Sequence, residues 1–326
     1  MMGGASAAFA FPAVMIKGFD KALFAAAERT SVIWLQGQSC SGCSVSLLNS
    51  VNPDIVKLIT EYISLNFHQT VCAGTGDACM KLIGEAVEKK RQDYVLVLEG
   101  SIPMANPLYS TLGSKDGKHI GIDYWVDSLA RNAVAILAVG TCASYGGIPA
   151  GRGNVTGAAG IIEFLRKRQI NKPVINIPGC PPHPGWMVGT IVHLVLKGTV
   201  PELDTDGRPV MFYGETVHEN CENLTSYRKG IFAKNWGDPG CLYNLGCLGM
   251  DTGCDIPKRK WLKGMNSCTA SGSGCIGCTE RVFPDTGSRG IYQHLQGSLE
   301  DINKIGSPEI RESILNIRKN GGVING

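Results

Sequence analysis

The sequence has no long hydrophobic run and almost no excess of charge of either sign. No apolar run reaches the ~20 residues that a membrane-spanning helix needs, so we expect that this chain does not itself cross a bilayer. The 31 Lys and Arg residues and 28 Asp and Glu residues leave a net charge of +3. Because a nucleic-acid-binding surface needs clustered basic residues, we expect no nucleic acid as a partner.

Hydrophobic periodicity is also scarce between residues 218 and 278. This segment is rich in Gly, Pro and Asn and cannot form a conventional apolar core. Bound metal can supply the missing folding energy. Two iron-sulfur clusters or two structural zinc sites would use the ligand types found here, and the spacing within the segment does not separate the two. The soft ligands are His218, Cys221, Cys241, Cys247, Cys254, Cys268, Cys275 and Cys278.

Apolar runs alternate with helical patterns in the first two hundred residues. We expect strands over residues 30–35, 65–68, 94–98, 134–139 and 174–177, and helices over residues 44–59, 77–90, 123–131, 157–168 and 185–196. Strands that are apolar on both faces and alternate with helices predict a parallel sheet covered on both sides. The predicted class is α/β, a flavodoxin-like doubly wound parallel sheet over residues 31–200, followed by a loop-rich domain over residues 201–326.

The two ends of the chain need separate interpretation. Residues 1–30 are apolar and rich in small residues, as in the hydrophobic part of an export signal, although no basic segment precedes them. Two alternatives stand: Met1 lies within a longer export signal, or residues 1–30 form a helix that packs on the protein. Near the other end, Ser307 and Pro308 predict the start of a further helix.

Four cysteines of the α/β part follow predicted strands. Since the binding crevice of a doubly wound sheet lies beyond the C-terminal ends of its strands, we expect these thiols to converge. They are Cys40, Cys43, Cys142 and Cys180. Four thiolates are typical of a four-iron cluster, with a redox dithiol or zinc as alternatives. Glu99 reaches the same edge, either to serve a partner or a proton path or to cap the following loop. Cys72 and Cys79 belong to no set, and we expect free thiols there.

Seven motifs in one order carry a resemblance to a known family. They are WLQGQSCSGCSVSLLN, VLEGSIP, GTCASYGGIPAGRGNVTG, NIPGCPPHPGWMVGT, VHENC, PGCLYNLGC and GCIGC. With them the chain resembles the small subunit of nickel-iron hydrogenases over residues 31–284, closest to the nickel-iron-selenium branch. The resemblance implies a subunit with three iron-sulfur clusters that relays electrons between the large subunit, where H2 is oxidised or produced, and an external carrier such as a cytochrome c or a ferredoxin. It would be active as a hydrogenase only with that large subunit.

The resemblance also implies the ligands of each cluster. The proximal cluster would be bound by Cys40, Cys43, Cys142 and Cys180, and the distal cluster by His218, Cys221, Cys241 and Cys247. The medial cluster would be bound by Cys254, Cys275 and Cys278, with Cys268 where many relatives have a proline. All three clusters are then expected to be 4Fe-4S, and the medial one 3Fe-4S if Cys268 is not a ligand. Oxygen-tolerant relatives have additional cysteines where this chain has Gly42 and Gly147, so a plain proximal cluster is expected.

Location and rival functions follow from the same comparison of motifs. Periplasmic members of the family use a twin-arginine signal, so we expect a periplasmic protein, with membrane association through partners as an alternative. If no such signal lies upstream, we expect a cytoplasmic protein.

Two rival functions stay open. One rival is the iron-sulfur subunit of a complex related to NADH:quinone oxidoreductase; such a subunit lacks the eight ligands that this chain has from His218 onward. The other rival is a zinc-stabilised binding protein.

Overall fold

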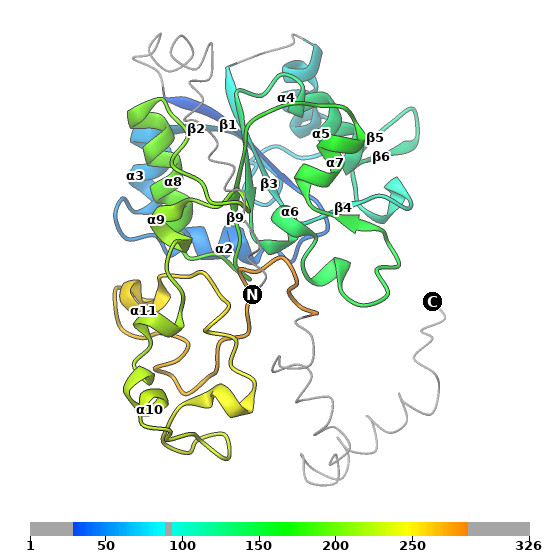
Figure 1. Cartoon of the computed structure of the whole chain (residues 1–326). Helices are drawn as coiled ribbons and strands as arrows, with labels where there is room; N and C mark the ends of the chain where they lie inside the picture. Colours follow the sequence, from blue (N-terminus) through cyan, green and yellow to red (C-terminus); the bar gives the residue numbers. More distant parts are fainter. Residues whose placement is uncertain (1–28, 89–92, 286–326) are drawn as a thin grey trace, which may run out of the picture.

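A five-stranded parallel sheet forms the centre of the protein (Figure 1). The computed structural model describes residues 29–88 and 93–285, so residues 1–28 and the helix expected at Ser307 lie outside the described part. The strands are β1 (Thr30–Gln36), β2 (Ile63–His68), β3 (Tyr94–Glu99), β7 (Ala135–Val139) and β9 (Val174–Ile177). Their order is β2-β1-β3-β7-β9, with every neighbouring pair parallel. This is the flavodoxin-like order, and the predicted fold class is confirmed.

Helices cover both faces of the sheet because alternate residues of each strand point to opposite sides. Val32, Val97 and Leu137 pack toward α2 (Gly42–Leu48) and α8 (Pro184–Lys197). The intervening residues, such as Leu96, pack toward helices on the other face, which are α4 (Gly76–Glu88), α5 (Ile122–Ala130), α6 (Thr141–Tyr145) and α7 (Ile161–Lys167). The sheet is therefore a rigid platform whose strand ends position the loops that follow them.

Two of the predicted helices were wrong in extent. The helix expected over residues 44–59 ends at Leu48, and the chain continues through a turn into α3 (Ile55–Lys57) and the π-helix η1 (Leu58–Tyr62). Pro53 explains the break, because its ring cannot continue a helix and it disfavours helical backbone at the preceding residue. The helix expected from residue 157 begins at Ile161, since β8 (Ala158–Ala159) pairs antiparallel with β4 (Ile102–Pro103).

The remaining elements are short. A hairpin of β5 (Thr111–Lys115) and β6 (Lys118–Gly121) precedes α5, with η2 (Pro107–Tyr109) before it and η3 (Ile148–Ala150) after α6. Beyond α8, the described chain has only short helices joined by turns: α9 (Val210–Tyr213), η4 (His218–Asn220), α10 (Leu224–Arg228), η5 (Leu242–Leu245) and α11 (Ile256–Arg259). Within residues 29–88 and 93–285, none of the helices has the length and hydrophobicity to cross a membrane.

This loop-rich part is attached to the sheet by buried polar contacts. The Arg208 guanidinium donates to Asp204 Oδ2 at 2.7 Å and to Glu280 Oε1 at 2.9 Å, and it lies over the ring of Tyr213. Glu280 Oε1 also accepts from the backbone N–H of Gly253 at 2.9 Å. Because Arg208 is only 9% exposed, these ion pairs are shielded from water and hold residues 253 and 280 beside residues 204–213. The same segment is joined to the sheet where the Asn176 backbone N–H of β9 donates to the Gly207 carbonyl at 2.8 Å.

Candidate metal centres

The structure brings together the four cysteines that follow strands, here called the strand-end set: Cys40, Cys43, Cys142 and Cys180. Cys43 lies in the first turn of α2 after β1, and Cys142 lies in α6 after β7. Burial raises the pKa of Cys43 well above its ordinary value, and Glu99 and the other three thiols raise it further. Burial raises the pKa of Cys142 to about 11. These thiols therefore keep their protons at neutral pH until a bound metal displaces them.

Glycines leave space for the sulfur atoms of the strand-end set. Gly140 has a φ of +90°, and a Cβ atom there would lie 2.6 Å from the Sγ atom of Cys43. Gly147 has a φ of +53°, and a Cβ atom there would lie 2.8 Å from the Sγ atom of Cys142. Both positions combine a left-handed backbone with close approach to a thiol, so a larger residue would push the sulfur away.

Glu99 is hydrogen-bonded to the turn that carries Cys43 of the strand-end set. This fully buried side chain accepts from Trp34 Nε1 at 3.2 Å and from Gln36 Nε2 at 3.1 Å. It also accepts from the Cys43 and Ser44 backbone N–H groups at 3.1 and 3.4 Å, and from the Ser44 hydroxyl. These contacts are with β1 and α2 and not with the loop after β3 that Glu99 was expected to cap, and a role toward a partner or a proton path stays a prediction. The carboxylate fixes the first turn of α2 and thereby the position of Cys43.

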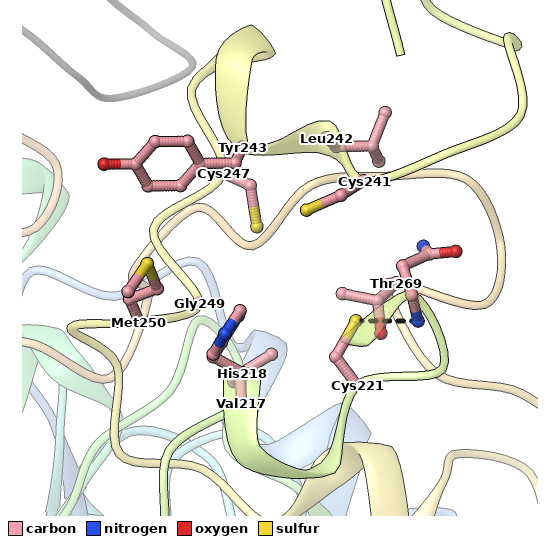
Figure 2. A pocket seen from close by; sticks show the side chains of 11 residues that line it. Val217, His218, Cys221, Cys241, Leu242, Tyr243, Cys247, Gly249, Met250 and Thr269 are labelled. Carbon is pink, nitrogen blue, oxygen red and sulfur yellow. Dashed lines mark hydrogen bonds between the residues drawn. The ribbon is translucent and has the colours of Figure 1, made fainter. Parts of the chain in front are cut away.

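The second group lines a single pocket. We call His218, Cys221, Cys241 and Cys247 the pocket set, and Figure 2 shows these four side chains around the pocket. The His218 ring packs edge-on against Tyr227, with ring centroids 4.5 Å apart. The Cys221 thiol accepts from the Asn223 backbone N–H at 3.4 Å, and burial raises its pKa. Thr269 also lines the pocket, and nothing in its sequence context predicted this.

The third group contains Cys254, Cys268, Cys275 and Cys278, and we call it the linking set. Burial raises the pKa of Cys254 well above its ordinary value, and Cys278 and Cys275 raise it further. The pKa of Cys278 is raised to about 12, chiefly by burial, with a further increase from Cys268. Cys268 is exposed as a residue, yet burial raises the pKa of its thiol, so the sulfur is directed inward.

The linking set contacts both other sets. The Cys275 backbone N–H donates to the Sγ atom of Cys247, a member of the pocket set, at 3.2 Å. On the other side, Cys278 receives a backbone hydrogen bond from Cys180 of the strand-end set, and the Thr141 hydroxyl donates to the Cys278 carbonyl. The three sets therefore form a continuous series from the edge of the sheet to the pocket that contains His218.

The donors fit soft metals, and eleven of the twelve side chains are cysteines. Within residues 29–88 and 93–285, no three His, Cys, Asp or Glu side chains lie close enough together to hold one metal ion. Thiolates are ligands both of zinc ions and of iron-sulfur clusters.

His183 joins the α/β part to the segment after α11. Its Nδ1 atom accepts from the Gly185 backbone N–H at 3.0 Å and caps α8. Its Nε2 atom lies 3.1 Å from the Lys260 carbonyl oxygen and must donate to it. The two contacts require a neutral ring. Burial lowers the pKa of His183 from 6.5 to about 4, and the nearby Arg259 guanidinium contributes to the same shift.

We expect this histidine to make stability fall in mild acid. The pKa of His183 is lower in the folded protein than in the unfolded one. The contribution of its neutral ring to the free energy of unfolding is therefore complete above pH 6.5 and is lost as the pH falls toward 4. Since the ring is partly exposed, the loss should stay below about 2 kcal/mol. Thermal unfolding of the wild type and of His183→Asn, whose side chain can still cap α8, should converge as the pH falls from 7 to 5. An identical pH slope in both proteins would contradict the prediction.

Comparisons with known proteins show which proteins this chain is similar to. A family model described as NADH ubiquinone oxidoreductase, 20 Kd subunit, matches residues 40–194, and a model of the C-terminal part of NiFe/NiFeSe hydrogenase small subunits matches residues 213–289. The chain is 44% identical over 280 residues to a periplasmic [NiFeSe] hydrogenase small subunit of Desulfomicrobium baculatum, covering 82% of this chain and 89% of the relative. It is 38% identical to a quinone-reactive Ni/Fe-hydrogenase small chain of Wolinella succinogenes, covering 80% and 73%. A crystal structure of the Desulfomicrobium baculatum Ni-Fe-Se hydrogenase matches with a TM-score of 0.75 at 44% identity, covering 79% of this chain and 97% of that chain.

Proposed function

Because the chain belongs to the family of NiFe/NiFeSe hydrogenase small subunits, we propose that its three ligand sets bind three iron-sulfur clusters arranged in series. Members of this family are electron-transfer subunits of hydrogenases, oxidoreductases that act on H2 together with a large subunit. The observation that carries the proposal is the contact of the linking set with both other sets. When bound, the clusters would supply one-electron oxidation and reduction.

Each set is assigned to one cluster. The strand-end set (Cys40, Cys43, Cys142, Cys180) would hold the proximal cluster, and the pocket set (His218, Cys221, Cys241, Cys247) the distal one. The linking set (Cys254, Cys268, Cys275, Cys278) would hold the medial cluster. With four ligands in each set, all three are proposed to be 4Fe-4S. Gly140 and Gly147 leave room for the sulfur atoms of Cys43 and Cys142, and Cys241, Cys254 and Cys275 are buried.

The proposal extends to partners and location. The nickel-iron centre would lie in a large subunit, and an external carrier such as a cytochrome c or a ferredoxin would dock near His218. We propose a periplasmic location, which the names of two relatives support. The subunit of a complex related to NADH:quinone oxidoreductase fits less well, because the hydrogenase family model matches the segment that contains eight of the twelve ligands.

The test of the function uses the complex of this chain with its large subunit. The purified complex should be brown, contain iron and acid-labile sulfide in roughly equal amounts, and reduce a viologen dye with H2. The chain purified alone should reduce none. Little iron or sulfide in the complex, with zinc in their place, would contradict the proposal, and so would H2 oxidation by the isolated chain.

Cys268→Pro tests the type of the medial cluster. If the Cys268 thiolate is a ligand, the variant should lose about one iron atom per complex and gain the electron paramagnetic resonance signal of a three-iron cluster when oxidised. Cys72→Ser, which alters a cysteine outside the three sets, should give the wild-type spectrum. If the wild type and Cys268→Pro give the same three-iron signal, Cys268 is not a ligand.

A further inference from the structure

Two cysteines outside the three ligand sets contact each other. Cys72 lies in the turn after β2, and Cys79 lies in the first half of α4. Their Sγ atoms are 2.6 Å apart, and both residues are half-buried. The sequence alone predicts two unrelated thiols here, because nothing in the intervening residues indicates how the turn folds back. The structure instead places the two sulfur atoms within reach of a covalent bond.

Both sides of the pair are held in place by the surrounding fold. The Cys72 backbone N–H donates to the His68 carbonyl at 2.9 Å, and the Thr70 hydroxyl donates to Gln36 Oε1 at 2.8 Å, so the turn is fixed to the ends of β1 and β2. On the other side, Cys79 packs against the core beneath α4. Gly74 lies so close to α4 that a Cβ atom at this position would be 3.4 Å from the Cys79 backbone nitrogen. The contact between the sulfur atoms thus follows from packed elements on both sides.

We propose that Cys72 and Cys79 form an intrachain disulfide bond that fastens the turn after β2 to α4. Its formation removes two protons and two electrons from the two thiols. The oxidant is a disulfide in the same compartment: one cysteine thiolate attacks it and forms a mixed disulfide, and the second cysteine displaces the oxidant as a dithiol. This inference is independent of the iron-sulfur clusters and adds a covalent modification to the proposed function.

Peptide mass measurement on the complex tests the bond directly. Cells are quenched in acid, and the denatured protein is alkylated without reductant and digested with trypsin. Cleavage after Lys57 and Lys81 releases residues 58–81, a peptide that contains Cys72 and Cys79 and no other cysteine. We expect this peptide to lack alkyl groups and to be two hydrogen atoms lighter than the dithiol. After reduction it should take up two alkyl groups.

Single substitutions supply the control. In Cys72→Ser the peptide should carry one alkyl group at Cys79 without any reductant, which shows that the reagent reaches this thiol. Cys79→Ser should give the reciprocal result at Cys72. Two alkyl groups on the wild-type peptide before reduction would overturn the proposal, as would a mixed disulfide with a small thiol at either position. Iron content and dye reduction are measured on the complex purified from a parallel sample of the same cells, so failure of the disulfide and failure of the proposed function are told apart.

Discussion

Cys142→Ser is expected to lower H2-dependent dye reduction by the complex at least about 100-fold and to remove at least about one iron atom. Cys142 lies in α6 at the end of β7, with the backbone of Gly147 against its sulfur. A serine hydroxyl is a harder and weaker ligand for iron than a thiolate, so the strand-end set would lose at least the iron atom that Cys142 is proposed to hold. Iron analysis and the viologen assay on the purified complex measure both effects.

The matched control is a cysteine in the same α/β part that belongs to no ligand set. Cys72→Ser should retain the iron content of the wild type and most of its activity, since the thiol lies in the turn after β2. A Cys142→Ser complex with wild-type iron and wild-type activity would contradict the assignment of the strand-end set.

Glu99→Gln should lower the free energy of unfolding by about 3–5 kcal/mol. The change keeps the size of the side chain, so the effect reports on hydrogen bonds and charge. The carboxylate accepts from Trp34, Gln36, Cys43 and Ser44. A glutamine would turn its N–H groups toward some of these donors and leave them without an acceptor in a buried position. Thermal unfolding of the complex measures the change.

An exposed glutamate provides the comparison for this variant. Glu163 on α7 pairs with Lys167 at 3.5 Å, and both side chains are more than half exposed. Glu163→Gln should change the free energy of unfolding by less than about 0.5 kcal/mol, because exposed ion pairs contribute little. If Glu99→Gln had an equally small effect, its carboxylate would not be what holds the first turn of α2.

The strands could be predicted from the sequence because their physical signature is local. All six residues of β3 are buried, so the run YVLVL needs no knowledge of the rest of the fold to indicate a central parallel strand. The same reasoning placed Cys142 and Cys180 at the ends of β7 and β9, where the structure has them. The prediction of one helix over residues 44–59 failed because apolar spacing was followed across Pro53, whose ring cannot continue a helix, whereas α2 already ends at Leu48.

The parts that sequence reasoning missed depend on contacts between distant segments. Thr269 reaches the pocket of His218 only because the loop after α11 folds back toward η4. The proximity of Cys72 and Cys79 depends on a turn whose direction is fixed by Gln36 and His68. The five donors around Glu99 come from β1 and α2, which converge only in the assembled sheet. None of these relations has a periodic or spacing signal in the sequence.

The contact between Cys275 and Cys247 bears on how the protein matures. The Cys275 amide holds the sulfur of Cys247, while the Cys275 carbonyl accepts from the Leu248 backbone N–H at 2.9 Å. The loop that contains Cys247 and Leu248 is therefore hydrogen-bonded to both the amide and the carbonyl of Cys275. Filling either site would immobilise part of the other and reduce the entropy lost when the second is filled. Molecules with only one of these two sites filled should then be rare during biogenesis, and the pocket set and the linking set should be filled together.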